Sequence, residues 1–333
     1  MNYYKRTADA LLQDLLDAFG AVLIEGPKWC GKTTTASQLA NSILRMQDPS
    51  MREEYLATAK TKPSILLKGD TPRLIDEWQD APMLWDAVRT TVDDRQIPGQ
   101  FILTGSNAVD KSQIHHSGAG RIARLRMLPM SLWESQESTG EVSLKELFNN
   151  PDYDIDGKMS KMTVEDLIFA ASRGGWPASL LARTPKAQLL VAKNYVQTIC
   201  SDDVSGIDGK KRDAKLTSMI LRAYARNVST LVKKKSLLDD VTSSGEVSCH
   251  VDTFDDYVSA LEKLFVIQNI SAWCPAIRSK TAIRSSVKRC FCDPSIPIAL
   301  LGLSPESLSM QLRTFGFIFE QMCIRDLKAY TID

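Results

Sequence analysis

The sequence lacks the features of a zinc site, a membrane span and a secretion signal. Its seven cysteines are dispersed and no two have C-x-x-C spacing, which predicts reduced thiols in a cytoplasm and argues against zinc. No hydrophobic run approaches the length of a membrane span, and the first residues, MNYYKRTADALL, lack the apolar core of a signal peptide. We therefore expect a cytoplasmic protein without membrane contact.

The sequence also lacks an excess of either charge. Its 41 Lys and Arg residues balance 40 Asp and Glu residues to a net charge of +1, which argues against a nucleic-acid coat but allows local basic patches. With 44% hydrophobic and 24% charged residues, the 333-residue chain has an ordinary globular composition. Its length is sufficient for two or three domains.

A phosphate-binding loop is the strongest feature that is present. The apolar run 21–24 predicts a buried strand, and GPKWCGKT at 26–33 then matches G-x-x-x-x-G-K-[ST] at every defined position. Glycines let backbone N–H groups surround phosphate oxygens, and the following helix presents its positive end to the same anion. A chance Gly-rich turn is the alternative, but the order strand, loop, helix disfavours it. The predicted nucleotide-binding residues are Gly26, Pro27, Lys28, Trp29, Cys30, Gly31, Lys32, Thr33 and Thr34.

The metal side of the same site is predicted at PRLIDEWQ, residues 72–79. An apolar strand that ends in two adjacent carboxylates is typical of P-loop ATPases, and strand alternation sends the two side chains in different directions. We expect Lys32 to reach the β- and γ-phosphates, and Thr33 and Asp76 to hold Mg²⁺. Glu77 is then the group that orients or deprotonates the attacking water. A solvent-facing acidic strand end is the alternative interpretation.

A third apolar strand, GQFILTGSN at 99–107, ends in small polar residues. Strand ends that carry ligands lie along one edge of a doubly wound sheet, beside the phosphate loop. Asn107, or failing it Ser106 or Thr104, is therefore predicted to touch the γ-phosphate or the water. The same residues also form a good turn or helix start, so this signal is weak by itself.

The order of these segments resembles a large group of prokaryotic AAA-type P-loop ATPases with a C-terminal domain of unknown function. In that family G-P-[RK]-x-x-G-K-T-T, L-[IL]-D-E-x-Q, L-T-G-S and a G-R followed by P-[LM]-S-x-x-E recur in this order, and all are present within residues 1–134. A G-[WF]-P element at 175–177 and a Tyr-to-Asp helix at 195–203 also match. The resemblance implies an α/β fold with a parallel sheet covered by helices on both faces, and ATP and Mg²⁺ as cofactors.

The resemblance also implies that Arg121 is an arginine finger, because AAA-type proteins place one just before the last core strand, expected here at 122–128. An arginine supplied to a neighbour's γ-phosphate can raise turnover by roughly 10³ to 10⁵. This role requires a homo-oligomer. The alternative, that Arg121 or Arg124 is an ordinary surface or ion-pair arginine, stays open.

Outside these motifs the sequence predicts mostly helices. We expect helices at 7–19 and 34–44, one more between 43 and 68, and three in the second half at 163–172, 186–204 and 213–228. The turn GGWP at 174–177 is expected to place Trp176 as a packing residue. The predicted parts are an ATPase domain at 1–134, a linker or insertion at 135–161, a helical lid at 162–232, a winged helix at 233–275 and an incomplete endonuclease-like domain at 276–333.

The winged helix is predicted from a helix, loop, helix, strand pattern at 236–273, and the resemblance implies it too. Basic residues flank it at 233–235 and 278–289, and they could neutralise DNA phosphates. Solvated charged faces and protein contacts are the alternatives. The last part resembles the opening of a restriction-endonuclease-like domain, with a strand that ends at Asp293 and a helix through Glu320. Two carboxylates are too few for metal-dependent phosphodiester cleavage, so nuclease activity is not expected.

Three functions can use such a site. The first is ATP hydrolysis by an oligomeric AAA-type protein coupled to DNA or a protein partner. The second is a nucleotide-gated binding or regulatory switch with negligible turnover, and the third is a small-molecule kinase. The adjacent pair Asp76 and Glu77, together with Asn107, argues against the kinase. The predicted catalytic residues are Lys32, Glu77, Asn107 and Arg121.

Overall fold

The structure, a computed structural model, describes residues 3–107, 114–243, 245–273 and 286–332. The chain divides into two compact units, one formed by Met1–Leu128 with Thr331–Asp333 and the other by Pro129–Tyr330. Within the described residues no helix is both long enough and apolar enough to cross a membrane. Each unit buries hydrophobic side chains of its own.

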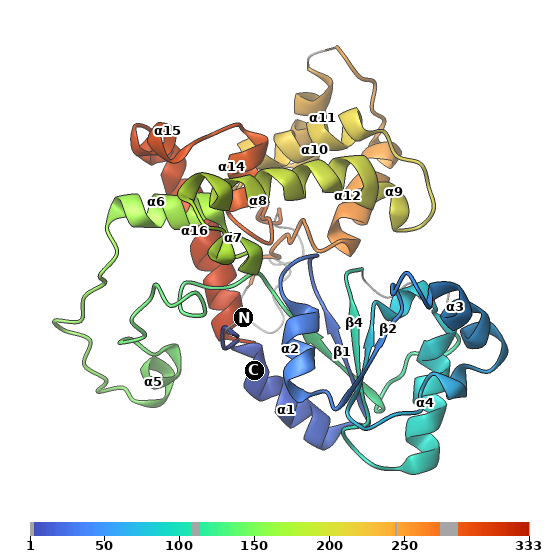
Figure 1. The fold of residues 1–333 in the computed structure, drawn as a ribbon. Coiled ribbons are helices and arrows are strands. Elements are labelled where there is room, and N and C mark those ends of the chain that lie inside the picture. The colour runs from blue at the N-terminus through green and yellow to red at the C-terminus, as the bar shows by residue number, and fades with distance from the viewer. Residues whose placement is uncertain (1–2, 108–113, 244, 274–285, 333) are drawn as a thin grey trace. The chain divides into compact units, whose positions relative to one another are not determined.

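A five-stranded parallel sheet forms the centre of the first unit, in the order β2-β3-β4-β1-β5 (Figure 1). Strands β1 and β4 are buried along their whole length, as expected for inner strands of a sheet covered on both faces. The strands are β1 Ala21–Glu25, β2 Ser42–Arg45, β3 Arg73–Asp76, β4 Phe101–Gly105 and β5 Ile122–Arg126.

Helices cover both faces of this sheet because its apolar side chains alternate between two cores. Ala21 and Leu23 of β1 pack into one core with α3 and α4, whereas Val22 and Ile24 pack into the other with α1 and α2 (Figure 1). The α/β fold with helices on both faces of a parallel sheet is therefore confirmed. The helices of this unit are α1 Ala8–Ala18, α2 Lys32–Leu39, α3 Arg52–Thr61 and α4 Met83–Arg95, with short 3-10 turns at Pro63–Ile65 and Trp78–Asp80.

The second unit is helical in its described part. The expected helices of the 163–228 region are confirmed as α6, α8 and α10, and α8 continues through a π-helical turn at Ile199–Asp203. The helices are α5 Leu144–Asn149, α6 Val164–Arg173, α7 Pro177–Leu181, α8 Pro185–Thr198, α9 Val204–Gly206, α10 Ala214–Arg226, α11 Lys234–Thr242, α12 Val251–Lys263, α14 Ser295–Leu300, α15 Pro305–Ser309 and α16 Leu312–Tyr330.

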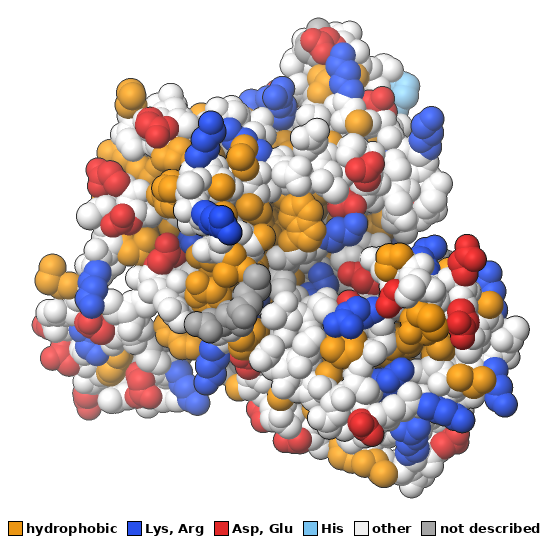
Figure 2. All heavy atoms as spheres, viewed as in Figure 1, with side chains coloured by type: hydrophobic (Ala, Val, Ile, Leu, Met, Phe, Trp, Pro, Cys, Tyr) orange, Lys and Arg blue, Asp and Glu red, His pale blue; other side chains and the backbone are white. Residues whose placement is uncertain are grey.

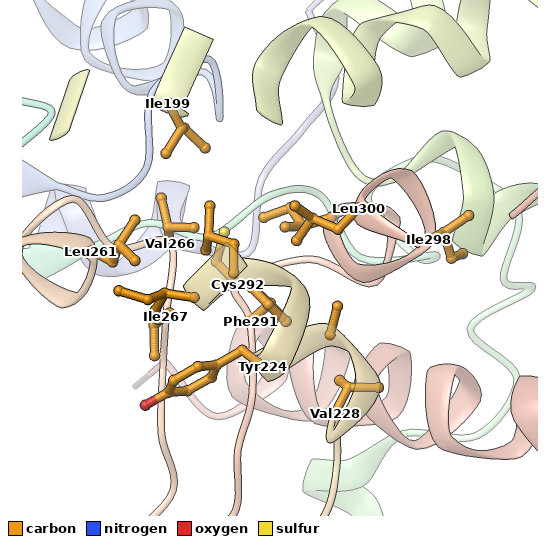
Figure 3. Packing of buried hydrophobic residues seen from close by; sticks show 14 of the residues in the cluster. Ile199, Tyr224, Val228, Leu261, Val266, Ile267, Phe291, Cys292, Ile298 and Leu300 are labelled. Atoms are coloured by element: carbon orange, nitrogen blue, oxygen red, sulfur yellow. The ribbon is translucent and has the colours of Figure 1, made fainter. Parts of the chain in front are cut away.

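One hydrophobic cluster joins most helices of the second unit. Figure 3 shows its centre, where Tyr224 of α10 lies near Phe291, Cys292 and Val266. The rings of Tyr224 and Phe291 meet edge to face with centroids 6.3 Å apart. Trp176 is fully buried in the same cluster, as expected for a packing residue.

A buried ionic network is the second structural feature of this unit. Arg325 on α16 pairs with Asp293 at 3.0 Å and with Asp326 at 2.7 Å, and the Arg325 and Asp293 side chains are at most 2% exposed. Asp293 also accepts the backbone N–H of Gly175 at 2.9 Å, and Asp326 accepts that of Leu132 at 3.0 Å. The network therefore holds three segments that are distant in sequence, and it gives Asp293 a structural role.

Three secondary-structure predictions are wrong. The helix expected at 34–44 ends at Leu39, and Ser42–Arg45 is the edge strand β2. The strand expected at the end of the 236–273 pattern and the strand expected to end at Asp293 contain only isolated antiparallel bridges, Ile267 with Phe291 and Ile270 with Lys288. The winged helix and the endonuclease-like domain stay predictions, and residues 278–285 of the basic segment lie outside the described residues.

Candidate nucleotide-binding site

The phosphate loop follows the carboxyl end of β1 and leads into α2, in the predicted order strand, loop, helix. Lys32, the first residue of α2, is 6% exposed, and its Nζ donates to the carbonyl oxygens of Gly26 at 3.0 Å and Pro27 at 2.9 Å. A Cβ on Gly26 would lie 2.2 Å from the carbonyl oxygen of Met127, so only glycine fits there. Gly31 has φ +101° at the helix start, a value that glycine adopts without strain.

The middle of the loop places its side chains in different environments. Trp29 has φ +64° and is 43% exposed, whereas Cys30 is fully buried. Thr34 is exposed in the first turn of α2. The loop is therefore anchored in the protein interior at Cys30, while Trp29 lies at the surface.

Arg6 supports this loop and was not found from the sequence. Its guanidinium is buried and donates to the carbonyl oxygens of Cys30 and Leu128, both at 2.7 Å. A charged group that donates to two backbone carbonyls fixes their positions strongly. Nearby, the Tyr3 hydroxyl donates to Asp9 at 2.6 Å and lies 2.9 Å from the Thr35 hydroxyl. Burial raises the pKa of Tyr3, so the phenol stays protonated.

The predicted metal ligands meet at the carboxyl ends of β3 and β4. The Thr33 hydroxyl donates to Asp76 Oδ1 at 2.7 Å, and the Thr104 hydroxyl donates to the same oxygen at 2.6 Å. Asp76 and Thr104 are paired in register across the two strands, which places them side by side. The structure thus brings together three residues that lie far apart in the sequence.

Glu77 begins a 3-10 turn directly after β3 and has φ +56°, an uncommon value for a residue with a side chain. Its Oε2 atom accepts hydrogen bonds from Gln79 Nε2 and, at 3.3 Å, from the Ser106 hydroxyl. Asn107 follows Ser106, and its buried Oδ1 has no hydrogen-bond partner in the described part of the chain. Glu77, Ser106 and Asn107 therefore gather at the same edge of the sheet as Asp76.

Arg121 is not brought to this edge. Its backbone oxygen accepts from Ala21 N, so it lies where β1 and β5 begin, whereas the phosphate loop follows the end of β1. A five-residue strand spans about 16 Å. The Arg121 side chain is 48% exposed and donates to Asp93 at 2.7 Å, and this bond lowers the pKa of Asp93. Within one chain Arg121 is therefore a surface ion-pair residue.

The donor set at the loop fits a nucleotide with Mg²⁺. Among the described residues no cluster of three or more His, Cys, Asp or Glu side chains could hold a metal by itself. Thr33 and Asp76 instead offer one hydroxyl and one carboxylate, and Mg²⁺ is often held by one or two carboxylates together with phosphate oxygens and water. Lys32, held at the loop carbonyls, would supply positive charge to such a nucleotide.

Three of the five described basic residues in the segments 233–235 and 288–289 have partners inside the chain. Lys234 pairs with Asp255 at 2.8 Å, and Lys288 pairs with Glu320. Arg289 donates to the Val232 carbonyl at 3.2 Å. Charged side chains of both signs are mixed over the face shown in Figure 2. These contacts reduce the positive charge that the described residues could offer to DNA.

Comparison with known families agrees with this geometry. Residues 18–136 match the model of an AAA domain, and residues 164–307 match that of a domain of unknown function, DUF8612. The first match contains the phosphate loop and every predicted catalytic residue.

Two proteins described as uncharacterized, one from Mycobacterium bovis and one from Mycobacterium tuberculosis, are each 25% identical to this chain over 334 residues. The alignments cover 96% of this chain and 65% of each mycobacterial protein, so the chain spans about two thirds of the length of these relatives.

A solved structure, the Walker-type ATPase PABY2304 of Pyrococcus abyssi, has the same fold with a TM-score of 0.51 and 12% identity. The match covers 90% of this chain and 96% of that one. Residues 18–136 are thus similar to an AAA domain and residues 164–307 to a domain of unknown function, and the fold is that of a Walker-type P-loop ATPase.

Proposed function

We propose that this chain binds ATP with Mg²⁺ and hydrolyses it. The observation that carries the proposal is the pair of hydrogen bonds from Thr33 and Thr104 to the same oxygen of Asp76, which joins the phosphate loop to two neighbouring strand ends. Lys32 would bind the β- and γ-phosphates, and Thr33 and Asp76 would hold the metal. Bound Mg²⁺ would neutralise charge on the phosphates.

Glu77 would take the proton of the attacking water, and Asn107 would hold the water or the γ-phosphate. The buried, unpaired Oδ1 of Asn107 supports this role, because a buried acceptor without a partner is costly and a bound water would satisfy it. The AAA family match and the ATPase fold support hydrolysis over transfer to a second substrate.

The test is phosphate release by the purified chain with ATP and Mg²⁺. We expect Lys32→Ala to abolish ATP binding and Glu77→Gln to abolish release while ATP binding is retained. Matched controls are Lys60→Ala and Glu53→Gln on α3, both exposed. Undiminished release by either site variant would refute the site. Tight ATP binding without release by the unaltered chain would instead identify a nucleotide-gated switch.

We further propose that Arg121 completes the site of a neighbouring copy. Its exposure just before the start of β5, away from the phosphate loop, fits a role across an interface rather than in its own site. A mixture of Lys32→Ala and Arg121→Ala proteins should regain activity, because each supplies what the other lacks. The matched control is Arg89→Ala, since Arg89 also pairs with Asp93, at 3.2 Å. No recovery in a verified mixed oligomer would contradict the proposal.

The coupled partner is proposed to be DNA or a protein. The ion pairs of Lys234 with Asp255 and of Lys288 with Glu320 argue against DNA as the partner, because they neutralise basic side chains that could bind phosphates. ATPase rates with and without duplex DNA, measured at several salt concentrations, decide between the two. A rate that no DNA changes would favour a protein partner.

A further inference from the structure

The Glu77 carboxylate is held through only one of its oxygens. Gln79 Nε2 and the Ser106 hydroxyl both donate to Oε2. Gln79 Nε2 also lies 3.5 Å from the Ser106 hydroxyl, so the three side chains form one cluster. Oε1 of Glu77 accepts no hydrogen bond from the described residues. One oxygen is therefore fixed and the other is available.

The backbone is shaped to make this contact. Glu77 adopts the left-handed conformation and starts the turn Trp78–Asp80, which brings the Gln79 side chain back beside the end of β3. A left-handed conformation at a residue with a Cβ costs conformational free energy and persists where the surrounding structure requires it. The residue that bears this conformational cost is Glu77, the proposed water-activating residue.

Gly105 at the end of β4 leaves room for the Gln79 amide. A Cβ there would lie 3.1 Å from Gln79 Oε1 and 3.0 Å from Trp78 Nε1. Both of these atoms are buried and have no hydrogen-bond partner among the described residues. The side-chain amide of Gln79 is thus held by the hydrogen bonds of its Nε2 atom with Glu77 and Ser106. Its Oε1 atom is buried but does not contribute to holding it.

Resting on the hydrolysis proposed above, we propose that Gln79, assisted by Ser106, is a positioning residue for Glu77. The amide holds Oε2 so that Oε1 faces the attacking water at hydrogen-bond distance. A general base must be within hydrogen-bond reach of the proton that it takes, and it loses effect when it rotates away. In the described structure Gln79 has no hydrogen bond with the phosphate loop, so it acts on the chemical step and not on nucleotide binding.

The first experiment separates these two steps in the full chain. We expect Gln79→Ala to lower kcat about 10- to 100-fold, the loss that a displaced catalytic group causes. KM for ATP and the Kd of a fluorescent ATP analogue should stay within about twofold, because binding does not use the catalytic geometry. The matched control is Gln13→Ala on α1, whose amide also donates to a carboxylate, Asp17, at 2.9 Å in an exposed position.

Two further variants guard against a purely structural effect. Gln79→Glu keeps the size of the side chain but replaces the donor with a second carboxylate, so it should lower kcat as Gln79→Ala does. In the Glu77→Gln background, Gln79→Ala should leave the Kd of the ATP analogue within about twofold, because neither side chain is used in nucleotide binding. Melting temperatures within a few degrees of the unaltered chain would confirm that each variant is folded.

The outcomes distinguish this inference from the function on which it rests. An active chain in which Glu77→Gln is inactive but Gln79→Ala keeps its kcat would overturn the inference and leave hydrolysis standing. A rise of kcat in Gln79→Ala, or a loss of ATP-analogue binding in that variant, would also overturn it. A chain that binds ATP but releases no phosphate would overturn both proposals.

Discussion

Replacing Arg325 by methionine should destabilise the helical unit strongly, because it removes the cation of a buried ionic network. Arg325 lies on α16, and its side chain is 2% exposed between Asp293 and Asp326. The exchange keeps much of the side-chain volume but leaves two buried carboxylates without their cation. Asp293 retains its hydrogen bonds from the backbone N–H groups of Ser295 and Gly175. The exchange therefore removes the charge compensation of Asp293 but leaves these hydrogen bonds in place.

The magnitude follows from the burial of the pair. Breaking a buried ion pair by removing one partner costs about 3 to 5 kcal/mol. For a unit of about 200 residues each kcal/mol lowers Tm by about 2 to 4 °C, so we expect a decrease of about 6 to 20 °C. The matched control is Arg226→Met, because its pair with Asp240 is at 2.8 Å but is 46% and 28% exposed. An exposed pair contributes about 0 to 1 kcal/mol.

The pH dependence gives a second readout. Burial raises the pKa of Asp326 in spite of the nearby Arg325, and loss of that cation raises it further. A carboxyl group whose pKa is raised in the folded state stabilises the fold below that pKa and destabilises it as the pH rises through it. The Arg325→Met variant should therefore lose more stability at pH 8 than at pH 5.

Urea unfolding followed by circular dichroism measures the change in free energy, and hydrogen exchange at the Gly175 and Leu132 amides assigns it to this unit. Both amides donate to the carboxylates of the network. An Arg325→Met variant that unfolds within about 1 kcal/mol of the unaltered chain, as expected for Arg226→Met, would refute the reasoning.

Three further predictions concern the nucleotide site and the thiols. Gly26→Ala should weaken binding of a fluorescent ATP analogue at least about tenfold, because the new Cβ would lie 2.2 Å from Met127 O; unchanged affinity would contradict the loop geometry. Thr33→Val should remove the Mg²⁺ dependence of ATP binding while binding without metal persists, and titration with EDTA measures it. Cys200 and Cys290 should resist alkylation at pH 8 until urea unfolds the chain, because burial raises the pKa of each thiol to about 11; rapid labelling in the folded chain would be inconsistent with this burial.

The candidate site could be predicted in large part because its residues stand at strand ends. The sequence places Asp76 and Thr104 after apolar runs, and neighbouring parallel strands bring such ends to one edge of the sheet. The pairing of Asp76 with Thr104 in register follows from this geometry. The order of the strands could not be predicted from the sequence. β1 lies between β4 and β5, which follow it in the chain, so the order depends on how the connections cross the sheet.

The edge strand β2 shows why short elements were missed. Its four residues, Ser42–Arg45, follow a helix and include two apolar residues that also fit a helical period. They form a strand because their backbone groups pair with β3. That pairing is a tertiary interaction, and it overrides the weak local preference of the segment.

Gln79 and Arg6 were missed for different reasons. Gln79 belongs to a segment that the sequence singled out, so a role for it could have been sought in its spacing of two residues from Glu77. Arg6 has no comparable signal, since it follows Lys5 in an ordinary polar stretch before α1. Arg6 can be recognised only from its buried hydrogen bonds to the carbonyl oxygens of Cys30 and Leu128, which exist only in the folded chain. A phosphate loop recognised from eight residues is therefore fixed in shape by a ninth that its pattern does not contain, and the same pattern on another fold need not adopt this geometry.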